Sequence, residues 1–148
     1  MKVSDQGIEL IKQMEGFSDV AYPDVGTGGA PFTIGYGRTF RVKPDQRCDR
    51  MQADYWLRHQ DAPKAAECVA RQVNRPLKQQ EFDALVSFVY NVGCTNFKGS
   101  TMLKLLNQGH KKAASAEFGK WVYADHKKLP GLVKRRKRER DVFDHGYL

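Results

Sequence analysis

Glu15 is the side chain whose sequence context best suits a proton donor. Residues 4–14 have helical spacing, with Ile8 and Ile11 on one apolar stripe, and Glu15 continues that stripe four residues after Ile11. A carboxyl group against apolar neighbours, at the negative end of a helix dipole, is hard to ionise. Both effects would push the pKa of Glu15 upward, as a general acid working near neutral pH requires, whereas pairing with an arginine would oppose them. The alternative is a terminal glutamate that simply reaches solvent.

Two more oxygen-bearing side chains lie in the glycine-rich segment 17–47. Asp24 follows Pro23, and Thr33 begins the run TIGYG. Cleavage of a glycosidic bond needs an acid for the leaving oxygen and a second carboxylate on the other face of the sugar. A hydroxyl group can hold the attacking water, so Glu15, Asp24 and Thr33 form a candidate catalytic set. The alternatives are a turn-forming aspartate after proline and an ordinary strand threonine.

Other kinds of site are not indicated. The four histidines are far from any nucleophile motif, and no phosphate-binding GxxxxGK[ST] loop or HExxH zinc motif occurs, so we expect no cofactor and no metal. The three cysteines, Cys48, Cys68 and Cys94, are widely spaced and form no CxxC pair. Free thiols are the default expectation, and a Cys48–Cys68 bridge stays open.

Composition indicates a folded, basic protein. With 148 residues, 41% hydrophobic and 28% charged, the chain suits one compact domain with a real core. No apolar run is long enough to span a membrane and no signal peptide opens the chain, so we expect synthesis in a cytoplasm. The net charge is +8, and the cluster at 134–140 supplies much of it. Such a protein concentrates at anionic surfaces: nucleic acid, lipid head groups or cell-wall polymers.

The pattern of elements predicts an α+β fold with a small N-terminal lobe, about 1–50, and a larger helical lobe, about 60–148. We expect short strands at 32–35 and 40–42, and one or two connecting helices within 49–73, with Pro63 near the first turn of the second. Further helices are expected at 78–92, 100–108, 111–123 and, after Pro130, about 131–145. The lobes would leave a cleft, with the three candidate residues on its small-lobe wall.

Three short segments around the candidate residues match a known pattern. They read Glu15-Gly16-Phe17, Ala21-Tyr22-Pro23-Asp24 and Thr33-Ile34-Gly35-Tyr36-Gly37. Together they resemble the active-site region of phage lysozymes, the endolysins of T-even and lambdoid type in glycoside hydrolase family 24. Similar segments follow in order at 87–93, 100–103 and 129–136, so the resemblance covers nearly the whole chain as a single lysozyme-like domain.

The resemblance implies hydrolysis of the β-1,4 bond between N-acetylmuramic acid and N-acetylglucosamine in peptidoglycan, for host cell lysis. Glu15 would be the general acid, and Asp24 would position or deprotonate the water or stabilise positive charge on the sugar. Thr33 would hold the water. An inverting mechanism is implied, with carboxyl groups about 6.5–9.5 Å apart. Tyr36 and Asn91 are candidate substrate contacts, although Tyr36 also suits core packing.

The chain departs from this pattern in its active-site loop. Eight residues separate Asp24 from Thr33 where the family usually has five, so Thr27 is an alternative holder of the water. Arg38 stands where relatives often have histidine. We expect a monomer that binds no nucleic acid and needs a separate membrane-permeabilising protein to reach the periplasm from the host cytoplasm.

The basic C-terminal helix allows other functions. Its helical spacing places Arg136 and Arg140 on the apolar side, where they would need a carboxylate partner such as Glu15 or Glu9. Outward-facing residues could contact anionic lipid or lipopolysaccharide, or could be a solvated face; they are Lys134, Lys137 and Arg138. Rival functions are a membrane-active basic antibacterial protein acting through this helix, a nucleic-acid-binding module and a lytic transglycosylase.

Overall fold

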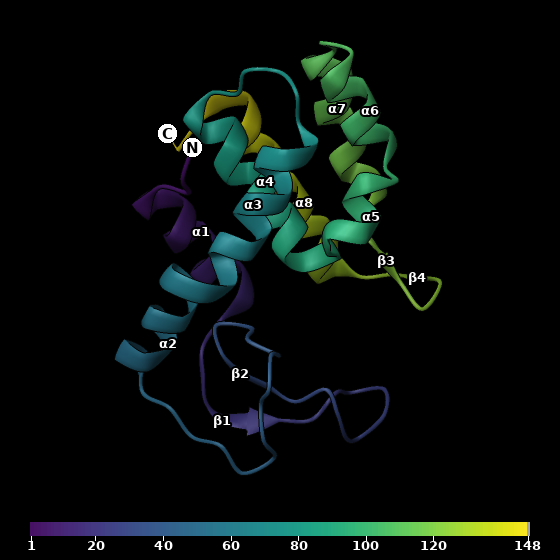
Figure 1. Cartoon of the computed structure of the whole chain (residues 1–148). Coiled ribbons are helices and arrows are strands. Elements are labelled where there is room, and N and C mark those ends of the chain that lie inside the picture. Colours follow the sequence, from purple (N-terminus) through teal and green to yellow (C-terminus); the bar gives the residue numbers. More distant parts are fainter. Residues whose placement is uncertain (148) are drawn as a thin grey trace. The chain divides into compact units, whose positions relative to one another are not determined.

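The computed structural model describes residues 1–147 as two compact units (Figure 1). The smaller unit is Ile8–Pro63, and the helical unit combines Met1–Gly7 with the chain from Lys64 onward. The predicted boundaries differ from these in two ways. The opening residues belong with the helices because Ser4 donates its backbone N–H to Asp83, at 3.0 Å. The connecting helix, up to Pro63, belongs with the smaller unit.

The smaller unit holds most of the first helix, a β-hairpin and a second helix. Its elements are α1 (Asp5–Glu15), β1 (Ser18–Tyr22), β2 (Thr33–Gly35), α2 (Arg50–Trp56) and a π-helical turn (Leu57–Asp61). The apolar stripe predicted on α1 is confirmed, since Ile8 and Ile11 are almost completely buried. Strand β1 was missed, and the strand predicted at 40–42 is wrong. Arg41 has a left-handed φ of 53°, which turns the backbone there instead of extending it.

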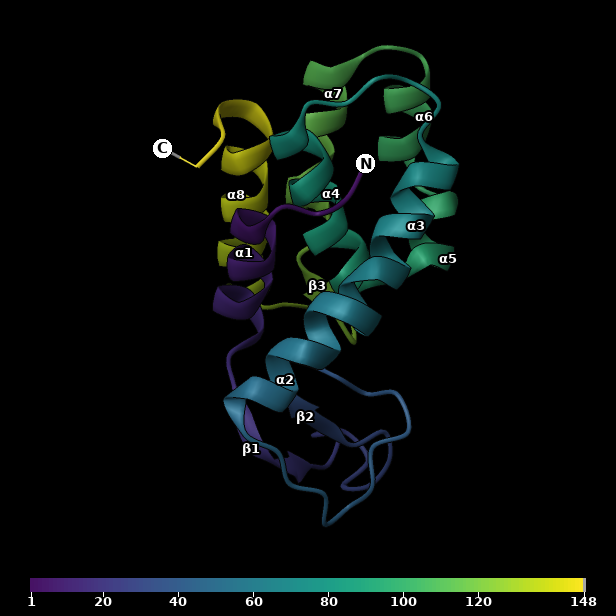
Figure 2. The same ribbon diagram turned by 60° about the vertical axis from the view of Figure 1, so that its left-hand side comes forward.

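The helical unit is built around α4. Its elements are α3 (Ala62–Gln72), α4 (Gln79–Val92), α5 (Cys94–Lys98), α6 (Thr101–Asn107), α7 (Lys111–Ala116), a 3-10 turn (Glu117–Lys120), β3 (Tyr123–Ala124), β4 (Lys127–Lys128) and α8 (Pro130–His145). Helix α8 runs along α4 in both views (Figures 1 and 2). Every residue of α4 from Glu81 to Val89 is buried, which explains its strongly apolar sequence.

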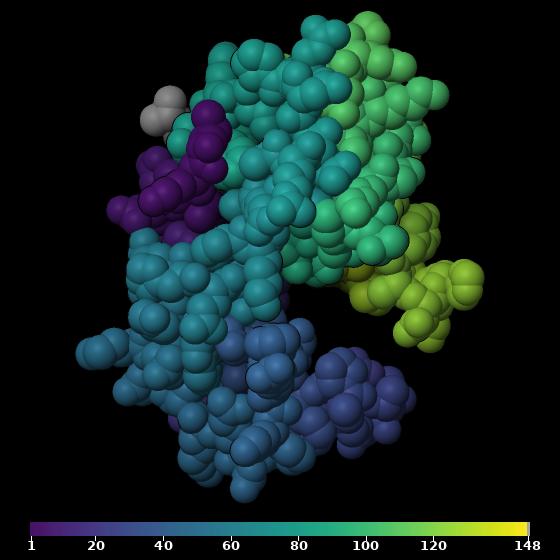
Figure 3. Space-filling view, viewed as in Figure 1, coloured from purple at the N-terminus to yellow at the C-terminus, as the bar shows by residue number. Residues whose placement is uncertain are grey.

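Local signals explain most of these helix boundaries. The Ser100 hydroxyl accepts the Leu103 N–H at 3.1 Å and caps α6, and Pro130 begins α8. The helix predicted at 111–123 is too long. It becomes the 3-10 turn after Ala116, and the chain then forms the β3–β4 hairpin, whose tip residues Asp125 and His126 have left-handed φ. This hairpin stands out from the helical unit (Figure 3).

The cysteines do not all stay reduced. Cys68 and Cys94 form a disulfide that joins α3 to α5, whereas Cys48 keeps a free thiol. The Cys48–Cys68 alternative is therefore wrong, and the expectation of three free thiols is wrong as well. Spacing alone gave no reason to choose this pair, because helix packing brings the two cysteines together.

Candidate active site

Glu15 is the last residue of α1 and lies against a tight turn of the hairpin. Ile34 and Arg38 exchange two backbone hydrogen bonds of 2.9 Å, which close a turn of three residues between them. Gly37 in this turn has a φ of 82°, and a Cβ placed on it would lie 2.4 Å from the Glu15 Oε1. The absence of a side chain at Gly37 is therefore what makes room for the Glu15 carboxyl group.

The Asp24 carboxylate organises the loop that follows β1. Its Oδ2 accepts the backbone N–H groups of Gly26 and Thr27, at 3.0 and 3.2 Å. Its own N–H and C=O bond to Gly29 and Gly28. The turn-forming role suggested for an aspartate after proline is thus present, and Asp24 is only partly buried. A carboxylate fixed by two N–H donors keeps one orientation.

Thr33 and Asp24 lie near one end of the β1–β2 ladder, and Glu15 lies near the other. Tyr22 pairs with Thr33, and Ser18 pairs with Gly35. Asp24 follows the first pair by two residues, whereas Glu15 precedes Ser18 by three. A step of four residues along β1 lies opposite a step of two along β2, so the register is irregular between these two pairs. In chain order, Glu15 therefore comes next to the Ser18–Gly35 end of the ladder, and Asp24 comes next to the Tyr22–Thr33 end.

The alternative residue Thr27 is used inside the loop. Its hydroxyl donates to the Ala30 carbonyl at 3.1 Å and accepts the Gly29 N–H at 3.2 Å. Both interactions stabilise the extended loop between Asp24 and Thr33. These contacts occupy the Thr27 hydroxyl within the loop, and the water-holding role of Thr33 stays a prediction.

Tyr36 is buried, with an exposed fraction of 8%. Its ring packs on Phe17, at 5.3 Å between centroids, and the Lys12 ammonium lies 5.1 Å from its centroid. These contacts fit the packing role considered for Tyr36, and its contact with substrate stays a prediction.

Two ion pairs that sequence reasoning missed support the site. Arg38 donates from Nη1 to both carboxylate oxygens of Asp61, at 2.8 and 2.9 Å, and its guanidinium lies 5.0 Å from the Trp56 ring. This pair joins the turn after β2 to the π-helical turn. Short π-helical segments often occur at functional sites. Lys12 bonds to Asp54 at 2.5 Å and ties α1 to α2, and this bond is the main cause of the lowered pKa of Asp54.

Asn91 belongs to the helical unit and is exposed near the end of α4. Its side-chain carbonyl accepts a hydrogen bond from Arg136 of α8, which is 1% exposed. Arg136 also bonds to Glu139, so Glu139 supplies a carboxylate for this buried cation. Arg140 does not share that buried side: its side chain is 48% exposed and pairs with Asp144. Arg135 is buried beside Arg136 instead.

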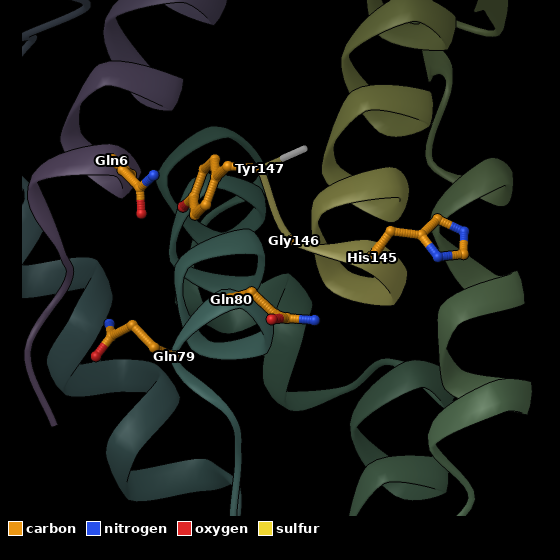
Figure 4. Close-up of a pocket in the computed structure, with 6 residues that line it drawn as sticks. All are labelled: Gln6, Gln79, Gln80, His145, Gly146 and Tyr147. Carbon is orange, nitrogen blue, oxygen red and sulfur yellow. The ribbon is translucent and has the colours of Figure 1, made fainter.

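The predicted outward basic residues and a polar pocket also lie in the helical unit. Lys134 and Lys137 are exposed, and Arg138 is partly exposed. Figure 4 shows the polar pocket, which contains none of the predicted site residues. Its lining is Gln6, Gln79, Gln80, His145, Gly146 and Tyr147.

Comparison with known proteins agrees with this geometry. The family described as Phage lysozyme matches residues 12–139. The endolysin of Acyrthosiphon pisum secondary endosymbiont phage 1 is 38% identical, over 97% of this chain and 99% of that protein. The endolysin of Salmonella phage P22 is 35% identical, over 97% and 98%. The muramidase domain of SpmX from Asticaccaulis excentricus has a TM-score of 0.87 at 35% identity, over 96% and 97%. The chain therefore belongs to the phage lysozyme family and is an endolysin-type glycoside hydrolase with the α+β lysozyme fold that lyses bacterial peptidoglycan.

Proposed function

We propose that the protein hydrolyses the β-1,4 bond between N-acetylmuramic acid and N-acetylglucosamine with inversion, using Glu15, Asp24 and Thr33. The observation that supports this most is the hairpin, which keeps Glu15 at one end of its ladder and Asp24 with Thr33 near the other. Inverting hydrolysis needs two separated carboxyl groups, with space for water between the sugar and the second of them.

In this mechanism Glu15 donates its proton to the glycosidic oxygen as the bond to the sugar's anomeric carbon breaks. Water attacks that carbon from the opposite face. Asp24 lies on the water's side, where it orients the water and accepts its proton as the new bond forms. The Thr33 hydroxyl holds the same water in line. The two backbone N–H donors on Asp24 keep its carboxylate in one place for this step.

Glu15→Gln tests the acid, with Glu9→Gln as its matched control. Glu9 is an exposed glutamate of the same helix, and it pairs with Lys12 at 3.4 Å. We expect the Glu15 variant to lose at least about a hundredfold in the rate of clearing purified peptidoglycan, because a positioned acid contributes that much. The Glu9 variant should clear it normally. Equal rates for Glu15→Gln and the parent would refute the assignment.

The products test the stereochemistry and the reaction class. An inverting hydrolase releases a reducing sugar that first has the α configuration, which proton NMR detects before mutarotation. A first product of β configuration would refute inversion. Anhydro-muramic ends would show a lytic transglycosylase instead.

We propose that Asn91 contacts the substrate, with Tyr36 as a second candidate. Asn91 is exposed, and Arg136 orients its amide, which suits a hydrogen bond to an N-acetyl group. Tyr36 is the weaker candidate because its ring is buried. Asn91→Ala should raise KM, whereas Tyr36→Phe should change KM little. A raised KM for Tyr36→Phe would show that its hydroxyl does reach the substrate.

A second proposal concerns anionic lipid or lipopolysaccharide. Lys134 and Lys137 line a hollow together with Lys128 of the β3–β4 hairpin, and its apolar lining residues are Pro130 and Val133. Lysines beside apolar side chains suit a lipid phosphate with its acyl chain. The parent protein should sediment together with phosphatidylglycerol vesicles, whereas a Lys134→Glu/Lys137→Glu variant should stay in the supernatant. Equal binding to phosphatidylcholine vesicles would refute the proposal.

The last proposal concerns the place of action. We propose that the protein acts in the periplasm after a separate membrane-permeabilising protein releases it from the host cytoplasm. Within residues 1–147, no helix is long and apolar enough to cross a membrane. Expression in Escherichia coli with and without a pore-forming protein is the test. Lysis at the same rate without the pore would refute dependence on release.

A further inference from the structure

The interface between α4 and α8 contains a cluster of charged and polar side chains where an apolar core would be expected. Arg135, Arg136 and Glu139 of α8 are 6%, 1% and 0% exposed, and Ser87 of α4 is 0% exposed. Burying such groups costs free energy, and apolar residues of similar volume often stabilise a fold equally well. The cluster therefore calls for a reason other than stability.

Glu139 is the centre of the cluster. Its Oε2 accepts hydrogen bonds from the Ser87 hydroxyl at 2.6 Å and from the Arg135 Nε at 3.1 Å, and its Oε1 accepts the Arg136 Nη1 at 2.8 Å. Burial raises the pKa of Glu139, and the two guanidinium groups and Ser87 oppose that rise. Three donors on two oxygens leave this carboxylate little freedom to rotate.

Arg136 extends the cluster to the surface. One terminal nitrogen, Nη1, is bonded to Glu139, and the other, Nη2, donates to the side-chain carbonyl of Asn91. The guanidinium also lies over the Phe88 ring, 5.0 Å from its centroid. Because the guanidinium group is planar and rigid, fixing one nitrogen fixes the other. The Asn91 carbonyl is thus held from inside, and its amide NH₂ is the group presented outward.

We propose that Glu139, with Ser87, is a positioning residue that acts through Arg136 to hold the Asn91 amide for the substrate. The outward NH₂ group is a donor, and the carbonyl oxygen of an N-acetyl group is an acceptor of matching chemistry. This inference rests on the proposed contact between Asn91 and the sugar. It adds a chain of hydrogen bonds from Ser87 and Glu139 through Arg136 to Asn91, which we call the relay. The relay fixes the orientation of the exposed Asn91 side chain.

Arg136→Lys tests the positioning role of this cluster. Both arginines bond to Glu139, and Arg136 also donates to Asn91. A lysine keeps the charge but cannot bridge two partners with a rigid fork. Arg136→Lys should therefore free the Asn91 amide.

The experiment measures kcat and KM on soluble, uncross-linked glycan strands, together with Tm. Asn91→Ala and Arg136→Lys should each raise KM about three- to tenfold, the worth of one hydrogen bond, with kcat little changed. The double variant should be no worse than Asn91→Ala alone, because both changes break one relay.

The outcomes distinguish this inference from the proposed function. If Asn91→Ala leaves KM unchanged, Asn91 is no substrate contact and the inference falls with it. If Asn91→Ala raises KM but Arg136→Lys does not, the contact stands and the relay is refuted. Multiplicative effects of the two substitutions in the double variant would also refute the relay. Glu139→Gln should raise KM in the same way, but it leaves two buried cations poorly paired, so Arg136→Lys is the decisive variant.

Discussion

Gly37→Ala is the substitution that should disturb the proposed acid most directly. The new Cβ would lie 2.4 Å from the Glu15 Oε1 and 2.9 Å from its Cδ. Ordinary contact between a methyl carbon and an oxygen atom is more than 3 Å, so the carboxyl group must move by about 1 Å. A displacement of that size at a reacting group can cost about a hundredfold in rate.

The stability cost of Gly37→Ala has a separate origin. The φ of Gly37 is 82°, and an L-residue with a left-handed backbone costs roughly 1–2 kcal/mol. Gly16→Ala is a matched control because Gly16 directly follows Glu15 and has a φ of 70°. A Cβ on Gly16 meets no atom within 4 Å. Both variants should lose similar stability from backbone strain, but only Gly37→Ala should displace the carboxyl group.

The assay compares kcat on purified peptidoglycan with the free energy of unfolding in urea. We expect Gly37→Ala to lose about a hundredfold in kcat. The kcat of Gly16→Ala should stay within about threefold of the parent value, which corresponds to less than about 1 kcal/mol in activation free energy. Equal kcat values for the two variants would show that contact with Gly37 does not position the acid. An unfolded Gly37→Ala protein at assay temperature would contradict the small strain estimated for this position.

Two further predictions concern stability. Because the Lys12 bond lowers the pKa of Asp54 in the folded state, the pair stabilises the protein above the usual aspartate pKa, and that stabilisation is lost as pH falls through the lowered value. Asp54→Asn should thus cost about 0.5–1 kcal/mol at pH 7 and clearly less at pH 3 in urea titrations, and an equal cost at both pH values would contradict this. The disulfide closes a loop with a sequence separation of 26 residues, so Cys68→Ala/Cys94→Ala should cost about 3.5 kcal/mol of unfolding free energy. Without reductant only the Cys48 thiol should react with a thiol reagent, and reaction of all three cysteines would refute the pairing.

The helices with strong periodic patterns were predictable from the sequence. The predicted helix at 78–92 matches α4 to within one residue, and the helix expected after Pro130 is α8. The short strands were less predictable, because hydrogen bonding to a partner strand defines them and their own sequences do not. Strand β1 has three exposed or partly exposed residues before Ala21, so it shows no clean alternation, and it exists because Thr33–Gly35 pairs with it.

The residue types and spacings alone determined the candidate catalytic set, the family and the fold class, because Glu15, Asp24 and Thr33 stand in short ordered motifs with a chemical logic of their own. The tertiary structure alone decided how those residues are held. It showed that Gly37 makes room for Glu15, that Asp61 anchors the turn through Arg38, and that Cys68 pairs with Cys94. The physical reason is that these contacts join segments far apart in the chain. Their energies depend on packing, which no local pattern encodes.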